Sequence, residues 1–396
     1  MMRACDIPHT EFVAQLSRHL ASVPASRVDN VRRGAVAIVI RLVPAAGGAA
    51  LPSFAVQGDR AALVQAVEAL LANPGMDGAQ AQILFIQRAM YPGDPWSGHI
   101  GFPGGKKEPQ DASDRATAER ETREELGLDL GGDAFVHLGA LDDAQAYFLC
   151  RGVVMAASPH VYLQVCHSTP EIALSAEVAS AHWVGLAQIL HQVDHPAAPF
   201  CANYRCIQRD MAAQVYPAYA ASRPLWFRIH AWLLGTTSYT MLPLQFTPRD
   251  SVVRTPATAS KSQFASDSEL YLWGLSLGMV CSLVDLGLPV APSSLAPGYV
   301  SVASPWPQLD RYRWADVNLV TNALHRLMWG PRCRKPWRIP MRRTPLGCTV
   351  GPARDYFLSY YAVLRIAFPL SCLAKLSLLC VLGRGVVRLL SRLVCA

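Results

Sequence analysis

Charged residues are scarce in this sequence: Asp, Glu, Lys and Arg make up 16% of its 396 residues, against 51% hydrophobic residues. Such a composition excludes an intrinsically disordered chain and is typical of a globular protein with a large core. The length fits two domains or one domain with large insertions. No internal repeat is visible.

The eleven cysteines include no CxxC pair, and no histidine cluster accompanies Cys201 and Cys206 at zinc-like spacing. This disfavours a structural zinc site and a disulfide framework. Residues 1–6 lack the apolar region of a secretory signal peptide, and residues 393–396 match neither a peroxisomal signal nor a prenylation box. We therefore expect free thiols and an intracellular, reducing compartment, with the organelle undetermined.

Nucleic-acid-binding motifs are also missing, because the sequence shows no helix-turn-helix, aromatic RNA-binding or zinc pattern. The net charge of +7 comes largely from residues after Arg311. A basic periphery of this kind meets anionic substrates or acidic lipid, or simply keeps a surface soluble. We expect no nucleic-acid partner.

Short apolar runs alternate with helical patterns, which predicts an α/β/α sandwich with a mixed sheet. The expected strands are 35–43, 81–89, 135–142, 153–157, 178–184 and 240–246, and the expected helices are 11–23, 60–72, 112–126 and 270–286. We divide the chain into an N-terminal helical segment (1–30), a catalytic domain (31–290) with insertions near 44–60, 191–239 and 249–268, a Pro/Arg-rich irregular extension (291–355), and an apolar, basic-edged C-terminal helix or helices (356–396).

The segment 102–128, FPGGKKEPQDASDRATAERETREELGL, carries the chemistry. On a helix, Glu121, Glu124 and Glu125 stand at i, i+3 and i+4, so their carboxylates share one face. Like charges at that spacing repel each other, whereas a hard cation such as Mg²⁺ prefers oxygen ligands. Arg120 precedes Glu124 by four residues and can orient it. The plainer interpretation is a solvated, salt-bridged helix face.

A Gly104-Gly105 turn precedes this helix. Glycine lets the backbone approach a metal and phosphates without a Cβ clash, and its carbonyl can serve as a ligand. We assign metal binding to Glu121, Glu124, Glu125 and the Gly105 carbonyl, and substrate binding to Phe102, Gly104, Gly105 and Lys106.

The run Arg120-Glu121-x-x-Glu124-Glu125-x-Gly127, with Gly105 and Asp111 upstream, resembles the Nudix hydrolase signature. The distance from Asp111 to Arg120 is one residue longer than is commonest in that family, and Asp111 replaces the usual Glu. The resemblance implies hydrolysis of a diphosphate bond in a small nucleoside-diphosphate-linked substrate, assisted by Mg²⁺ or Mn²⁺. It implies catalytic roles for Arg120, Glu121 and Glu124, with Glu121 as our choice of general base.

The longer spacing, the phrase FPGGK, Gly98 and Arg88 resemble the coenzyme A diphosphatase branch of the family, whereas Trp96 stands where that branch often has histidine. We therefore expect coenzyme A or an acyl derivative as substrate. The alternatives are a broader dinucleotide or nucleotide-sugar diphosphatase and a non-catalytic module that senses a nucleotide or scaffolds a complex. The intact glutamate triad argues against the non-catalytic module.

The C-terminal tail is a separate feature. Residues 366–383 contain only one charged residue, Lys375, and Arg384, Arg388 and Arg392 then recur at every fourth position. A basic, amphipathic helix of this kind binds in the membrane interface. We rank peripheral membrane contact first, helices packed on the catalytic domain second, and a membrane-spanning anchor third. The oligomeric state is left open.

Overall fold

A computed structural model describes the chain in pieces: residues 6–22, 24–29, 31–45, 54, 59–91, 97–148, 152–166, 169–193, 205–210, 219, 222–234, 236–246, 248–253, 270–288, 315–329, 363, 366–367, 369–378 and 380–385. The chain forms two compact units. Unit 1 comprises Met1–Arg205, Thr240–Pro305 and Arg343–Thr349, and unit 2 comprises Cys206–Tyr239, Trp306–Arg342 and Val350–Ala396.

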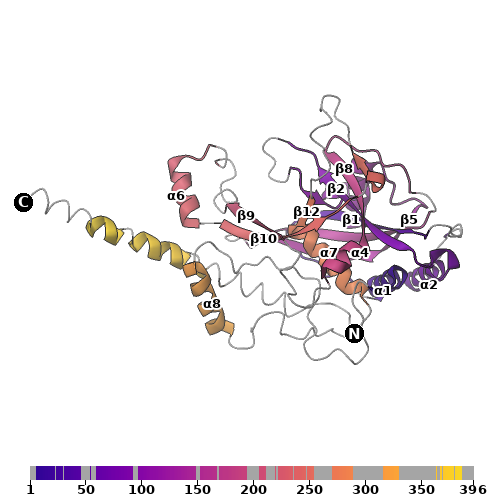
Figure 1. The fold of residues 1–396 in the computed structure, drawn as a ribbon, viewed down its shortest axis with the longest axis horizontal. Coiled ribbons are helices and arrows are strands. Elements are labelled where there is room, and N and C mark those ends of the chain that lie inside the picture. Colours follow the sequence, from indigo (N-terminus) through magenta and orange to yellow (C-terminus); the bar gives the residue numbers. More distant parts are fainter. Residues whose placement is uncertain are drawn as a thin grey trace, which may run out of the picture. The chain divides into compact units, whose positions relative to one another are not determined.

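Unit 1 is built on a nine-stranded sheet in the order β11-β8-β2-β1-β7-β5, with β3, β4 and β6 added on β2, β1 and β7 (Figure 1). Strand β1 (Arg32–Val43) runs parallel to β7 (Gly152–Gln164), whereas its pairing with β2 (Gln80–Arg88) is antiparallel. The predicted mixed-sheet α/β fold is thus confirmed. The other strands are β3 (Ile100–Gly101), β4 (Gly104–Lys106), β5 (Phe135–Ala140), β6 (Ala144–Phe148), β8 (Val178–Gly185) and β11 (Ser251–Val253).

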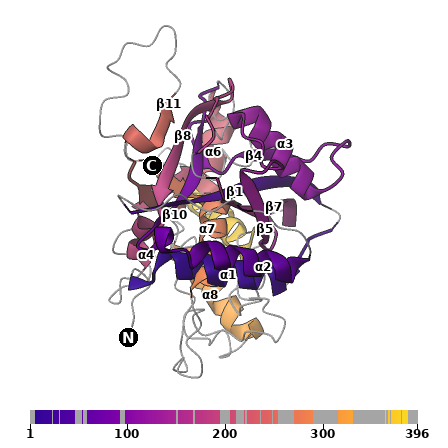
Figure 2. The ribbon, with the colours of Figure 1, turned by 90° about the vertical axis from the view of Figure 1, so that its right-hand side faces the viewer.

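Helices cover both faces of this sheet. Alternate residues of β1 point to opposite sides, so they belong to two separate cores. Ile38 and Ile40 belong to a core that includes side chains of α1 (His9–Ser22), α2 (Arg60–Leu71), α4 (Leu186–Val193) and α7 (Gly274–Gly287). Ala37 and Val39 instead pack with Ala118 and Leu126 of α3 (Asp114–Leu126). Figure 2 shows α1 and α2 on one side of β1 and α3 on the other.

The predicted helix 270–286 needs correction at its start. Residues Leu270–Trp273 form a strand, β12, which pairs with β10 (Thr236–Leu244), and α7 begins only at Gly274. The run LYLW is apolar and aromatic, so it fits a half-buried strand as well as a helix. On its other edge, β10 pairs with β9 (Arg205–Asp210).

Unit 2 is helical, in its described elements, outside β9 and the start of β10. It contains α6 (Leu225–Leu234), α8 (Ala315–Trp329) and helical residues 366–367, 369–378 and 380–385, which we name the C-terminal segment. Helix α8 corrects the expectation of an irregular extension over 291–355. No proline lies between Pro307 and Pro331, so Val317, Val320 and Leu324 can recur at helical spacing. None of the described helices is long and apolar enough to cross a membrane. Of the predicted insertions, 44–60 and 249–268 lie mostly outside the described residues.

Candidate active site

Helix α3 carries the three glutamates, and both of its ends are capped. The Ser113 hydroxyl accepts a hydrogen bond from the Ala116 amide at 3.1 Å, so Ser113 is the N-cap. Gly127 ends the helix with a φ of +70°, a left-handed conformation that favours glycine. The sequence predicted this helix as 112–126, and the structure begins it two residues later.

The Gly104-Gly105 pair lies in a short strand, β4, rather than in the predicted turn. It pairs with Gly34–Val36 of β1. Gly104 has a φ of +148°, and a Cβ added there would lie 2.3 Å from the Ala35 carbonyl oxygen. A Cβ on Gly105 would lie 2.5 Å from the Glu121 carboxylate. Only glycine therefore allows α3 and β1 to approach β4 this closely.

Arg120 is the hub of the site, because its guanidinium reaches three carboxylates. It donates to Asp111 at 3.0 Å through Nε and again through Nη2, to Glu121 at 3.0 Å and to Glu124 at 3.0 Å. It also donates to the Lys106 carbonyl at 3.1 Å, which ties α3 to β4. Arg120 thus holds the glutamate face against the glycine strand.

The strongest of these interactions joins Arg120 to Asp111, whose side chain is only 4% exposed. The hydrogen bonds from Arg120 hold the pKa of Asp111 well below its usual range, and those with Asp111 raise the pKa of Arg120. The Thr117 hydroxyl adds a further hydrogen bond to Asp111 at 2.9 Å. Asp111 therefore stays ionised and orients Arg120, although it is one residue further from Arg120 than the usual family spacing.

Glu121 and Glu125 lie in a partly dehydrated environment. Glu125 is 4% exposed, and its Oε2 accepts a hydrogen bond from the Gly104 amide at 2.8 Å. Burial raises the pKa of Glu125 to about 8. Burial also raises the pKa of Glu121, against the lowering effect of the Arg120 guanidinium. Glu124, in contrast, is the exposed member of the three, with 59% of its side chain accessible.

The donor chemistry of this face fits Mg²⁺ or Mn²⁺, which bind carboxylate oxygens, and Gly105 leaves room beside Glu121 that a Cβ would fill. In this conformation the three carboxylates accept hydrogen bonds from Arg120 or from the Gly104 amide. Across the part of the chain that the structure describes, no three His, Cys, Asp or Glu side chains lie close enough together to hold a metal ion. The Gly105 carbonyl faces β1, since a Cβ at Gly34 would lie 2.6 Å from its oxygen. Its predicted role as a ligand stays a prediction.

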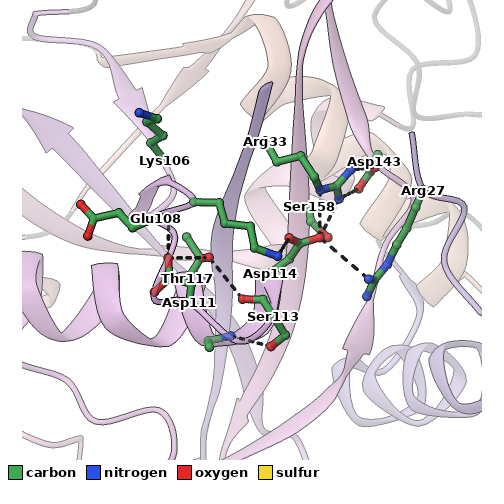
Figure 3. Close-up of polar contacts among 12 residues, drawn as sticks. Arg27, Arg33, Lys106, Glu108, Asp111, Ser113, Asp114, Thr117, Asp143 and Ser158 are labelled. Carbon is green, nitrogen blue, oxygen red and sulfur yellow. Dashed lines mark hydrogen bonds and ion pairs between the residues drawn. The ribbon is translucent and has the colours of Figure 1, made fainter. Parts of the chain in front are cut away.

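Two of the residues assigned to substrate binding differ in their surroundings. The Phe102 ring is 5% exposed and stacks on Phe85 with centroids 4.9 Å apart. It packs within the core beside the glycine strand, and its predicted role in substrate binding stays a prediction. Lys106 is exposed, and Figure 3 shows its side chain directed away from the neighbouring polar network. Trp96 lies outside the described residues.

A buried ion network anchors the start of α3 (Figure 3). Arg33 of β1 donates to Asp114 at 2.6 Å and to Asp143 at 2.9 Å, and Lys107 donates to Asp114 at 3.0 Å. The two aspartate side chains are 2% and 1% exposed. Burial would raise the pKa of Asp114, but the hydrogen bonds from Arg33 and Lys107 hold it below its ordinary value. This network joins α3, β1 and the loop after β5.

Glu177 was not among the predicted site residues, yet its charge acts on Glu121 and Glu125 and raises the pKa of each. The loop before β8 docks on the end of α3, where the Ser175 amide donates to the Glu125 carbonyl at 2.9 Å. The Glu177 carbonyl accepts from the Ala89 amide at 2.8 Å. The positive charge of Arg88 acts in the opposite direction and lowers the pKa of Glu125.

The glutamate helix α3 lies within the part of the chain that matches a family model. Residues 64–204 match the family model described as the NUDIX domain. Strand β1 precedes the matched residues but belongs to the same sheet. An uncharacterized protein of Schizosaccharomyces pombe is 30% identical over 182 residues, which cover 44% of this chain and 49% of that protein. The chain thus spans about half the length of this curated relative.

Comparison with solved structures finds chains that carry Nudix names. The NUDIX domain of Shewanella oneidensis NrtR, complexed with ADP ribose, is 16% identical, covers 41% of this chain and 79% of that one, and has a TM-score of 0.24. A C. elegans Ap4A hydrolase binary complex is 16% identical, with coverages of 42% and 88% and a TM-score of 0.25. A Nudix hydrolase from M. smegmatis, RenU, is 14% identical, with coverages of 51% and 95% and a TM-score of 0.25. Likenesses of this degree do not bear on the substrate.

Proposed function

We propose that the protein is a metal-dependent hydrolase that cuts a diphosphate bond in a nucleoside-diphosphate-linked small molecule. The observation that carries the proposal is the packing of the Glu121 carboxylate against Gly105, with Arg120 bridging Glu121 and Glu124. A Nudix domain over 64–204 supports the same reaction class.

In this mechanism Glu121, Glu124 and Glu125 would hold Mg²⁺ or Mn²⁺. When bound, such an ion neutralises the diphosphate and lowers the pKa of a coordinated water. Glu121 would take the proton from the attacking water, in keeping with the resemblance of this segment to the Nudix signature. Asp111 and Arg120 keep the glutamates in place, and the Gly104-Gly105 strand lets a phosphate approach the backbone.

The decisive experiment incubates the full chain with a panel of diphosphate compounds and Mg²⁺ or Mn²⁺, and identifies the products. The panel includes ADP-ribose, Ap4A, nucleotide sugars, coenzyme A and acyl-coenzyme A. Glu124→Gln should lower kcat about 100-fold or more while the fold is kept, because it removes a charged metal donor from an exposed position. Glu119→Gln is the matched control, since Glu119 on the same helix pairs with Arg115 and Tyr162 instead. Equal activity in both variants would remove Glu124 from the metal site.

For the substrate we propose coenzyme A or an acyl derivative, on the strength of the FPGGK segment, Gly98 and the lengthened distance from Asp111 to Arg120. Release of 3′,5′-ADP and phosphopantetheine would support it. Cleavage of dinucleotides or nucleotide sugars alone would replace it with the broader diphosphatase. Absence of turnover on every compound with either metal would favour a nucleotide-sensing module.

A further inference from the structure

The C-terminal segment of unit 2 is amphipathic, but its large apolar side chains are exposed, whereas a helix that faces water would bury them. Val363, Ala367 and Ser371 recur every four residues and are buried, and Lys375 continues this face with 14% of its side chain exposed. The buried face therefore carries small or polar residues.

This inward face is held to α8 by an ion pair. The Lys375 ammonium lies 3.0 Å from the Asp316 carboxylate. On the same helix, Val317 and Thr321 are fully buried. Small and hydroxyl-bearing residues on buried helix faces, together with a salt bridge, are typical of helix packing in apolar surroundings, where leucine gains nothing by turning inward.

The outward face of the segment carries the large apolar side chains. Ile366, Leu370 and Leu373 are 46%, 48% and 60% exposed. Four more exposed apolar residues follow on the same segment: Leu376, Leu378, Val381 and Leu382. Leaving this row in water forfeits the free energy that burial of such apolar side chains would gain. A contiguous exposed apolar face of this kind marks an interaction site.

The positive charge of the segment indicates an anionic partner. Residues 356–396 contain Arg365, Lys375, Arg384, Arg388 and Arg392 and no acidic residue. Leucine-rich helices edged by arginine bind the boundary between anionic headgroups and acyl chains. We propose that this outward face docks on a membrane surface that contains anionic lipid. The proposal rests on unit 2 alone and is independent of the reaction assigned to the Nudix domain.

The test is flotation of the purified full chain with lipid vesicles. One set of vesicles is phosphatidylcholine alone, and the other contains phosphatidylserine as well. The chain should float with both and more strongly with phosphatidylserine, and added salt should reduce that difference. A chain that stays at the bottom of the gradient with both sets would overturn the proposal.

Variants separate lipid binding from self-association of the chain. Leu370→Ser with Leu373→Ser should weaken vesicle binding by roughly tenfold or more per leucine, because apolar contact is lost. Ala374→Ser is the matched control on an exposed neighbouring position and should bind as the parent does. Circular dichroism of each variant checks the helical content. If the double variant floats normally, or if it only abolishes self-association seen by analytical ultracentrifugation without lipid, the face belongs to something other than a membrane.

Discussion

Unit 1 buries its large apolar side chains on both faces of one sheet, whereas most of the large apolar side chains described as exposed belong to unit 2. In unit 1 the buried carboxylates of Asp114 and Asp143 are both paired with Arg33. In the C-terminal segment, Ser371 is buried and Leu373 is exposed. The contrast indicates that unit 1 is organised around a rigid site and unit 2 around an outward-facing surface.

The largest effect that would test this rigidity is expected from Gly104→Ala. The added Cβ would lie 2.3 Å from the Ala35 carbonyl oxygen and 2.6 Å from the Val36 Cα, at a φ of +148°. Backbone atoms must separate, so we expect a loss of about 3 kcal/mol or more in unfolding free energy and loss of hydrolysis. Denaturant titration and an activity assay measure both. Gly185→Ala is the control, because nothing lies within 4 Å of its Cβ. Equal stability of the two variants would show that β4 is loosely held.

The next largest effect is expected from Asp143→Asn. The change leaves the Arg33 guanidinium with one ionised partner fewer in a buried network, which costs about 3 kcal/mol. Asp129→Asn removes an exposed ion pair with Arg123 and should cost less than about 1 kcal/mol. The measurement is again the unfolding free energy. Similar costs for the two changes would contradict the anchoring role of the Arg33 network.

Sequence patterns predicted α3, β1, β2 and β8 well, because apolar periodicity and capping residues act locally. They did not predict β4, since a Gly-Gly-Lys run has no preference for a strand and pairs only because β1 lies beside it. The glutamate face and its Arg120 partner followed from helical spacing. Glu177 did not, because it lies far along the chain and reaches the site only through the docking of its loop on α3.

An effect of intermediate size is expected on the stability of the protein at acidic pH. Burial lowers the pKa of His160 to about 4, below the ordinary value near 6.5. The unfolded chain therefore binds more protons between these pH values, so stability is present above pH 6.5 and falls as the pH drops toward 4. His160→Gln should make this fall shallower by up to about 1.4 kcal/mol per pH unit. Unfolding free energies measured at several pH values check it, and an unchanged slope would count against the burial of a neutral His160.

A smaller effect is expected from Glu177→Gln, on activity and not on stability. The substitution removes a negative charge that acts on Glu121 and Glu125. We expect about a tenfold loss in kcat with the cation present, because one carboxylate fewer stabilises it. Glu171→Gln, at an exposed position before the docked loop, should leave kcat unchanged. If Glu177→Gln also leaves kcat unchanged, Glu177 is not part of the site, which then consists of the residues that the sequence predicted.

The smallest effect, that of Leu373→Ala in buffer, sharpens the contrast between the units most directly. The change shortens a side chain that is 60% exposed and should cost less than about 1 kcal/mol of unfolding free energy in water. Leu84→Ala in β2 is the matched comparison, because it removes the same atoms from a fully buried side chain and should cost about 2–5 kcal/mol. The order should be reversed for vesicle binding: Leu373→Ala should weaken binding more than Leu84→Ala does, because only Leu373 lies on the outward face. Thermal unfolding in buffer and flotation with vesicles provide the two measurements. A large loss of stability from Leu373→Ala in buffer would mean that this face is covered within the protein, and the difference between the units would then be one of packing alone.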